Sequence, residues 1–284
     1  MDTQSRASAG REPRKTVTVR DFQRMKKEGD RIAVLTCYDY LFARILSQTD
    51  VDAVLVGDSL GQVVLGYRST LPVTLDEMIH HTSAVRRGLE GPMLILDMPF
   101  LSYQVSDEEA LRNAGRVIKE TGCEAVKVEG GDAETLSRVR TLVSAGIPVM
   151  GHVGLTPQAV HQLGGYRLTG REVKEAERLL GEARGLEEAG CFSMVLEMVP
   201  TELASSITAS LEIPTIGIGA GDECDGQVLV LPDMLGLNEE FTPKFLRRFA
   251  ELGEAVREGV GSFVDAVKSG EYPNESERYD VGAA

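Results

Sequence analysis

Several features that mark membrane, secreted and zinc-binding proteins are missing from this sequence. No apolar run approaches the roughly 18 residues that a membrane span needs, and residues 1–15 have no apolar core of a secretory signal. We therefore expect a cytoplasmic protein whose residues 1–15 form a disordered tail. None of the four cysteines belongs to a C-x-x-C pair, so a zinc site is not indicated and buried, reduced thiols are expected.

Lysine is also scarce. The chain has eight lysines among 30 basic residues, against 44 acidic residues, which gives a net charge of −14. Such a chain should repel nucleic acid and anionic membrane surfaces, so neither is an expected partner. An acidic, lysine-poor composition indicates either a halophilic protein or an ordinary acidic enzyme, and the sequence leaves both open.

What the sequence does contain is a regular series of short apolar runs. They are rich in Val, Ile and Leu and are apolar throughout rather than alternating, which is typical of parallel strands buried on both faces. The eight predicted strands are Ile32–Cys37, Ala53–Gly57, Met93–Met98, Ala125–Glu129, Pro148–His152, Phe192–Met198, Thr215–Ile218 and Gln227–Val230.

Amphipathic segments separate these runs. Thr74 and Glu77 form a capping-box pattern at the start of a helix predicted over Leu75–Gly88. Glycine is placed to end two other helices. Further helices are predicted over Asp107–Gly122, Arg171–Gly190 and Thr201–Leu211.

This alternation predicts an α/β protein with a closed (βα)8 TIM barrel, formed by residues 16–284 as a single domain. A helix over Val19–Gly29 would plug the bottom of the barrel, and a helix over Pro243–Ser269 would extend the C-terminus. The C-terminal helix would pack on the barrel or on a neighbouring subunit. The short spacing between the sixth and seventh strands predicts that one βα unit is trimmed there.

Three acidic residues stand at the ends of three different predicted strands. They are Asp58, Asp97 and Glu129. Strand C-termini of a parallel barrel open onto one face, where barrel enzymes keep their chemistry. Three carboxylates converging there predict a site for a divalent cation such as Mg²⁺. The alternative interpretation is ion pairing or helix capping.

Three further residues fall on the same expected face. Lys127 shares a strand side with Glu129, so it could bind a substrate oxyanion or pair with Glu129 itself. Glu197 ends an apolar run, and desolvation there would raise its pKa and suit a general base, unless it is salt-bridged. His152 could bind a polar substrate group or support the metal face, or it could be structural.

Seven segments, in chain order between Thr16 and Gly261, resemble the ketopantoate hydroxymethyltransferase family. Each is weak alone, but seven in order are highly specific. They are Val56–Gly61, Ser69–Thr74, Asp97–Phe100 with Ser102 and Tyr103, Lys127–Gly131, Gly151–Gln158, Leu196–Pro200, and Gly217–Gly221 with Cys224–Leu229.

The resemblance implies a reaction and a set of site residues. It implies transfer of a hydroxymethyl group from 5,10-methylenetetrahydrofolate to 3-methyl-2-oxobutanoate (2-oxoisovalerate), which forms ketopantoate for pantothenate and coenzyme A synthesis. By the same resemblance, Asp58, Asp97 and Glu129 surround Mg²⁺, and Glu197 is the base. The oxoacid would contact Asp58, Ser59, Asp97 and Lys127. A homo-oligomer is also implied, since members are often decamers.

The chemistry of these residue types agrees with that reaction. A Mg²⁺-stabilised enolate of the oxoacid would attack the one-carbon unit, with Lys127 adding positive charge and Glu197 taking the proton. The sequence departs from the family pattern at Gln62 and Arg68, which leaves the pterin contacts open.

Two rival functions remain at this point. A carbon–carbon lyase or phosphonomutase of a related barrel group would usually need a catalytic cysteine in a K-K-C-G-H-like motif, which is absent. A non-catalytic metabolite-binding barrel would be expected to lack one of the carboxylates or Glu197.

Overall fold

The computed structural model describes residues 15–279, so the predicted N-terminal tail lies outside the described residues except for Lys15. The chain divides into two compact units, the first ending at Val230 and the second beginning at Leu231. We describe each unit by itself, and the prediction of one domain over residues 16–284 stays a prediction.

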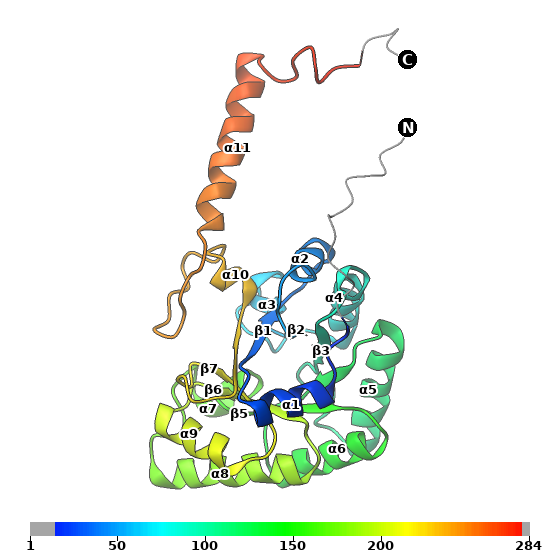
Figure 1. Ribbon diagram of the computed structural model, residues 1–284, viewed down its shortest axis with the longest axis vertical. Helices are drawn as coiled ribbons and strands as arrows, with labels where there is room; N and C mark the ends of the chain where they lie inside the picture. Colours follow the sequence, from blue (N-terminus) through cyan, green and yellow to red (C-terminus); the bar gives the residue numbers. More distant parts are fainter. Residues whose placement is uncertain (1–14, 280–284) are drawn as a thin grey trace. The chain divides into compact units, whose positions relative to one another are not determined.

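The first unit is a closed barrel of eight parallel strands, as the sequence predicts (Figure 1). Each strand pairs with the next in sequence, and β8 pairs with β1 to close the barrel. The strands are β1 (Ile32–Thr36), β2 (Ala53–Val56), β3 (Met93–Asp97), β4 (Ala125–Lys127), β5 (Val149–Gly154), β6 (Ser193–Glu197), β7 (Thr215–Ile218) and β8 (Gly226–Leu229).

The barrel interior is filled by alternate residues of the strands. Successive side chains of a strand point to opposite faces, so residues two apart share the interior. Large and small apolar side chains from every strand form one buried cluster there, as in a packed barrel core. Its strand members include Ile32, Val34, Ala53, Leu55, Met93, Ile95, Ala125, Met150, Val195, Ile216 and Val228.

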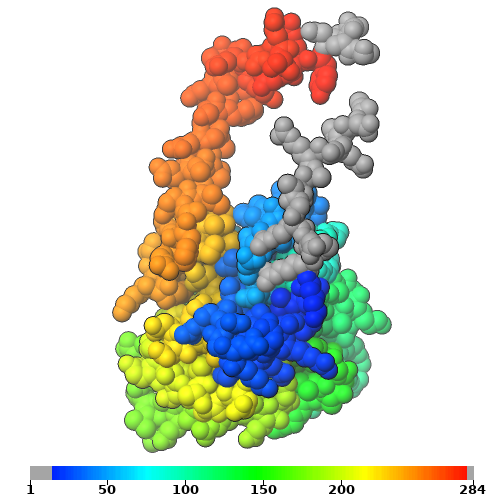
Figure 2. Space-filling model, in the orientation of Figure 1, coloured from blue at the N-terminus to red at the C-terminus, as the bar shows by residue number. Residues whose placement is uncertain are grey.

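Helix α1 (Val19–Glu28) closes the N-terminal end of the barrel, which confirms the predicted plug. Phe22 is fully buried in the core cluster, and its ring packs edge-on against Phe192 at 5.5 Å between centroids. Lys26 forms an ion pair at 2.9 Å with Asp225, the residue before β8, which ties the helix to the start of that strand. In Figure 2, α1 and the residues beside it, coloured dark blue, cover the middle of this face of the first unit.

The helices between the strands follow the capping signals in the sequence. Helix α4 (Leu75–Gly88) has the predicted capping box, in which Thr74 accepts from the N–H of Glu77 and Glu77 accepts from the N–H of Thr74. Helix α5 (Asp107–Thr121) ends at Gly122 in a left-handed conformation. The remaining predicted helices are α8 (Val173–Glu188) and α9 (Thr201–Ser210). Elements that were not predicted are α2 (Tyr40–Leu46), α3 (Leu60–Val63), α6 (Ala133–Ser144), the 3-10 turn η1 (Pro157–Ala159) and α7 (Val160–Leu163).

The trimmed βα unit lies one position later than predicted. Helix α9 is present between β6 and β7, so that unit is complete although it is short. Between β7 and β8, residues 219–225 form bends without a helix. The chain can return so directly because Gly221 passes close to α9, where a Cβ would lie 2.5 Å from Oγ1 of Thr201.

The second unit contains α10 (Leu231–Met234) and α11 (Leu252–Ser269). The prediction of a helix starting at Pro243 is wrong, because the N–H groups of Phe249 and Leu252 bond to carbonyl groups of the α10 end. These bonds, to the carbonyls of Met234 and Leu235, replace helical ones. Within residues 15–279, no helix has the length and hydropathy that crossing a membrane would demand.

Candidate active site

The predicted site residues continue the inward-facing rows of the barrel to its C-terminal end. Ile95, Ala125, Met150 and Val195 are core residues of four neighbouring strands. Because side chains alternate, the residues two positions further along each strand face the same interior. These next residues are Asp97, Lys127, His152 and Glu197. Local strand geometry therefore gathers four polar side chains where the apolar core ends.

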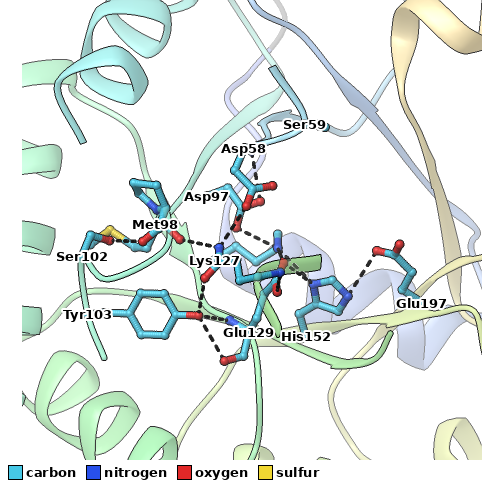
Figure 3. A network of polar contacts seen from close by, with 12 residues as sticks. Asp58, Ser59, Asp97, Met98, Ser102, Tyr103, Lys127, Glu129, His152 and Glu197 are labelled. Atoms are coloured by element: carbon cyan, nitrogen blue, oxygen red, sulfur yellow. Dashed lines mark hydrogen bonds and ion pairs between the residues drawn. The ribbon is translucent and has the colours of Figure 1, made fainter. Parts of the chain in front are cut away.

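The three predicted metal ligands come together at this point. One carboxylate oxygen from each of Asp58, Asp97 and Glu129 lies within 4.8 Å of the others, and all three residues are buried (Figure 3). None of them caps a helix. The N-cap positions of the helices that follow are Ser59, which makes no side-chain capping bond, and Ser106 and Asp132, which do. The capping alternative is thereby excluded, and the group offers hard oxygen donors of the kind that Mg²⁺ prefers.

Lys127 provides the positive charge among these carboxylates, and it lies closer to Asp97 than to Glu129, the ion-pair partner that the sequence offered as one of two alternatives. Its Nζ lies 2.7 Å from Oδ1 of Asp97 and 3.7 Å from Oε1 of Glu129. The sequence pointed to Glu129 as an ion-pair partner because Lys127 and Glu129 are two residues apart and so face the same side of the strand. Pairing of β3 with β4 places Asp97 directly opposite Lys127, and that cross-strand relation decides the contact.

The cluster carries more negative than positive charge. Burial, with the charges of Asp97 and Glu129, raises the pKa of Asp58 well above its usual range. Burial also raises the pKa of Asp97, against the opposing effect of Lys127. For Glu129 burial acts in the same direction, but Lys127 and His152 outweigh it and lower the pKa. A divalent cation would supply the missing positive charge, so the donor set fits Mg²⁺.

His152 links the carboxylate cluster to Glu197. Its Nδ1 lies 3.5 Å from Oε1 of Glu129 and 3.1 Å from Nζ of Lys127, and its Nε2 lies 3.3 Å from Oε2 of Glu197. Burial and Lys127 act to lower the pKa of His152, but the contacts with Glu129 and Glu197 raise it to about 9. Both ring nitrogens therefore lie within ion-pair distance of a carboxylate, and a neutral ring that accepts from Lys127 keeps its proton on Nε2, the nitrogen nearer Glu197.

Glu197 is less buried than the sequence predicts. As the last residue of β6, its side chain retains 21% exposure, against 3% for that of His152. The apolar run before it suggests a desolvated carboxylate, but the strand leaves the core at this residue. Glu197 therefore faces the open end of the site, where it can meet a ligand from solvent.

Two buried residues of the site, Tyr103 and Gln158, belong to segments that resemble the family, but the sequence alone indicates no role for them. Gln158, in η1, donates through its backbone N–H to Oε2 of Glu129 and through Nε2 to Oδ2 of Asp58, both at 3.0 Å. The Tyr103 hydroxyl accepts from the N–H of Glu129 at 2.9 Å. Burial raises the pKa of Tyr103 well above its usual range, so the phenol stays neutral. The only sequence signal that could have pointed to these two residues was their position within the family-like segments.

Ser59 also lies at this end of the barrel, with a defined partner. Its Oγ is 2.8 Å from the hydroxyl of Tyr38, which follows β1. The carbonyl of Tyr38 is in turn 2.7 Å from Nδ1 of His81. The two departures from the family pattern, Gln62 and Arg68, are both exposed on the segment after β2.

Comparison of sequences places this site in a known family. The family model described as ketopantoate hydroxymethyltransferase matches residues 16–275. A 3-methyl-2-oxobutanoate hydroxymethyltransferase of Pelobacter propionicus is 54% identical over 268 residues, which are 94% of this chain and 98% of that protein. The enzyme of the same name from Prosthecochloris aestuarii is 52% identical over 267 residues, covering 93% and 96% of the two chains.

Comparison of structures shows the fold. A 2,3-dimethylmalate lyase of the PEP mutase/isocitrate lyase superfamily aligns with a TM-score of 0.58 at 17% identity, covering 93% of each chain. Phosphoenolpyruvate phosphomutase from Streptomyces platensis aligns with a TM-score of 0.60 at 12% identity, covering 89% of this chain and 88% of that chain. The barrel architecture is shared with these proteins.

Proposed function

The chain belongs to the ketopantoate hydroxymethyltransferase family, and we propose that it transfers a hydroxymethyl group from 5,10-methylenetetrahydrofolate to 3-methyl-2-oxobutanoate. The product would be 2-dehydropantoate (ketopantoate), for pantothenate and coenzyme A synthesis. The observation that carries the proposal is the buried group of Asp58, Asp97 and Glu129 around Lys127, with Glu197 at its open side. This combination suits a reaction that builds negative charge on a small oxoacid.

Asp58, Asp97 and Glu129 would hold Mg²⁺. The bound cation would act as a Lewis acid toward the oxygens of the oxoacid. Support for this assignment comes from the raised pKa values of Asp58 and Asp97, because carboxylates buried with excess negative charge gain most from a divalent partner. Titration with Mn²⁺ or Mg²⁺ by calorimetry tests the assignment, and a protein that binds neither would contradict it.

Glu197 would be the general base. It would take the proton from carbon 3 of the oxoacid, which leaves an enolate. Water would hydrolyse the methylene group of the folate: both carbon–nitrogen bonds break, the two nitrogens take up the protons of water, and formaldehyde is formed. The enolate carbon would attack the formaldehyde carbon, and the resulting alkoxide would take up a proton to give the hydroxymethyl group. His152 supports this role because its Nε2 lies 3.3 Å from Oε2 of Glu197, on the side of the carboxylate cluster.

Lys127 and Ser59 would bind the oxoacid together with Asp58 and Asp97. The Lys127 ammonium stays charged, because burial acts to lower its pKa but the surrounding carboxylates raise it above its usual range. It would therefore face an anionic substrate with a fixed positive charge. The hydroxyl of Ser59 is held by Tyr38, which supports its use as an oriented hydrogen-bond partner.

Two substitutions and one exchange reaction test the base. Glu197→Gln keeps the side-chain volume but removes the proton acceptor, so exchange of the carbon-3 proton of 3-methyl-2-oxobutanoate in D₂O should stop. Mg²⁺-dependent oxoacid binding should remain, since Glu197 is outside the carboxylate cluster. Glu202→Gln, in the first turn of α9, is the matched control and should exchange normally. Exchange that survives in Glu197→Gln would assign the base elsewhere.

The overall reaction is tested with purified protein, 3-methyl-2-oxobutanoate, methylenetetrahydrofolate and Mg²⁺. Ketopantoate should be detected by mass spectrometry and should disappear with a chelator. Running the assay at low and at molar KCl also tests the halophilic proposal, which the net charge of −14 supports. An activity optimum at low salt would contradict that part alone.

We also propose a homo-oligomer in a reducing, cytoplasmic compartment. On α11, exposed apolar side chains recur every three or four residues, which puts them on one face of the helix. They are Val256, Val260, Phe263 and Val267. All four cysteines are buried and free, as a reducing compartment favours. Light scattering should give a mass of several subunits, reduced by Val260→Asp; a monomeric wild type would contradict the assembly.

A further inference from the structure

Gln158 reaches two of the three clustered carboxylates from a separate loop. It lies in η1, after β5, and only 6% of the residue is exposed. Its side-chain Nε2 donates to Oδ2 of Asp58, and its backbone N–H donates to Oε2 of Glu129, each at 3.0 Å. Asp58 follows β2 and Glu129 follows β4, so this one residue joins the ends of two strands that are not neighbours in the barrel.

The orientation of the Gln158 amide is fixed by its surroundings. Its Nε2 faces the carbonyl of Met98 at 2.9 Å, which can only accept, and Oδ2 of Asp58 at 3.0 Å, which accepts as a carboxylate. Its Oε1 faces the Tyr103 hydroxyl and Nε2 of Gln104, both at 3.0 Å and both able to donate. A reversed amide would set oxygen against oxygen at the Met98 carbonyl, so every polar atom of the side chain is matched in one orientation.

A neutral donor has a specific value at this position. Three carboxylates this close repel one another, and unrestrained side chains would turn apart. A second basic residue beside Lys127 could hold them, but its added charge would compete with a bound cation. The backbone N–H and the side-chain amide of Gln158 restrain the carboxylate oxygens without adding charge. The negative charge of the carboxylates therefore remains available to bind a cation. Partners of this kind around metal ligands commonly change metal affinity by about 10- to 100-fold when they are removed.

We propose that Gln158 is a positioning residue that holds the carboxylates of Asp58 and Glu129 ready to bind a divalent cation. This inference rests on the proposed function, because it takes the carboxylate cluster as the Mg²⁺ site. It goes further because it states that a residue of the segment after β5 holds the carboxylates of that site in place. Gln158 itself contacts neither substrate nor reacting atoms in this role.

Mn²⁺ binding, measured by electron paramagnetic resonance on the full chain, tests the inference without any assay of activity. Gln158→Met keeps the side-chain length and removes the side-chain bond to Asp58, while the backbone bond to Glu129 remains, and we expect Mn²⁺ affinity to fall about tenfold or more. Gln158→Glu keeps the acceptor for Tyr103 and replaces the donor that faces Asp58, so it should also bind more weakly. Gln104→Met is the matched control, because it removes a bond to Gln158 but touches no carboxylate, and its affinity should be unchanged.

The outcomes separate the two proposals. A wild-type protein that binds no Mn²⁺ would remove the metal site and this inference with it. Wild-type binding with equal affinity in folded Gln158→Met and Gln158→Glu would overturn the inference alone. Melting curves with and without Mn²⁺ distinguish a structural role, which would lower the melting temperature but leave the cation-induced rise intact. If neither variant folds at any Mn²⁺ concentration, Gln158 is structural and the inference is overturned.

Discussion

Lys127 and Asp97 are paired directly across the β3–β4 ladder, each as the last residue of its strand. The ammonium nitrogen lies 2.7 Å from Oδ1 of Asp97, and the two side chains are only 4% and 3% exposed. The backbone register therefore sets the position of the one lysine in a group of three carboxylates. In the proposed reaction, this pair would lie where the anionic substrate and the cation meet.

Lys127→Met should destabilise the protein strongly in the absence of a cation. It leaves three buried carboxylates without their positive partner, and breaking a buried pair in this way typically costs about 3–5 kcal/mol. Urea unfolding monitored by circular dichroism measures the change, and added Mg²⁺ should restore part of it. Arg112→Met is the control, since its pair with Glu108 has the same 2.7 Å distance but is largely exposed. Equal effects of the two substitutions would mean that burial of the pair is unimportant.

His152→Gln should reduce kcat by about a hundredfold with a smaller change in KM. The reason is that Glu197 would lose the contact that orients it, and small misplacements of a catalytic group have effects of this size. Steady-state kinetics with 3-methyl-2-oxobutanoate as the varied substrate measures both constants. His161→Gln, in the short helix α7, is a suitable control. A rise in KM alone would instead assign His152 to substrate binding.

Phe22→Ala should remove about 3–5 kcal/mol from the free energy of unfolding, because the ring is fully buried against Phe192 at the barrel bottom. Activity per folded molecule should change little, since the site lies at the opposite end. Urea titration measures the free energy of unfolding, and an assay at low temperature measures the activity per folded molecule. Leu41→Ala is the control, because Leu41 is 68% exposed. A selective loss of activity in folded Phe22→Ala would show that the plug and the site are coupled.

Stability should fall as the pH rises from about 9 to 12, and Cys191 should contribute to the fall. Burial raises the pKa of its thiol to about 12, whereas an unfolded cysteine has a pKa of about 8.5. Between these values the folded state keeps a proton that the unfolded state has lost, so increasing pH favours unfolding. Below about pH 8.5 both states are protonated and the contribution is fully present.

Urea midpoints for wild type and Cys191→Ala at pH 8, 9, 10 and 11 measure this contribution. The substitution lowers stability at every pH by removing buried atoms, but the wild-type curve should fall more steeply. Parallel curves would show that the thiol does not titrate differently in the two states. The same thiol should resist alkylation at pH 8 until the protein is unfolded.

Local sequence patterns were sufficient for most of the architecture. The eight apolar runs are the eight strands, because a strand buried on both faces needs continuous Val, Ile and Leu. The Thr74–Glu77 capping box starts α4 as expected, since it depends on residues three apart. The helix over Pro243–Ser269 was predicted too long because the N–H groups of Phe249 and Leu252 found carbonyl partners outside any local pattern.

The candidate site divides in the same way. Strand periodicity by itself determined that Asp97, Lys127 and Glu197 would stand at the barrel mouth, because each lies two residues after an inward core position. Only the tertiary structure decided that Lys127 pairs with Asp97 and that Gln158 joins Asp58 to Glu129. Those contacts depend on the register between strands and on a loop closing over the barrel, and a single chain's periodicity carries no information on either.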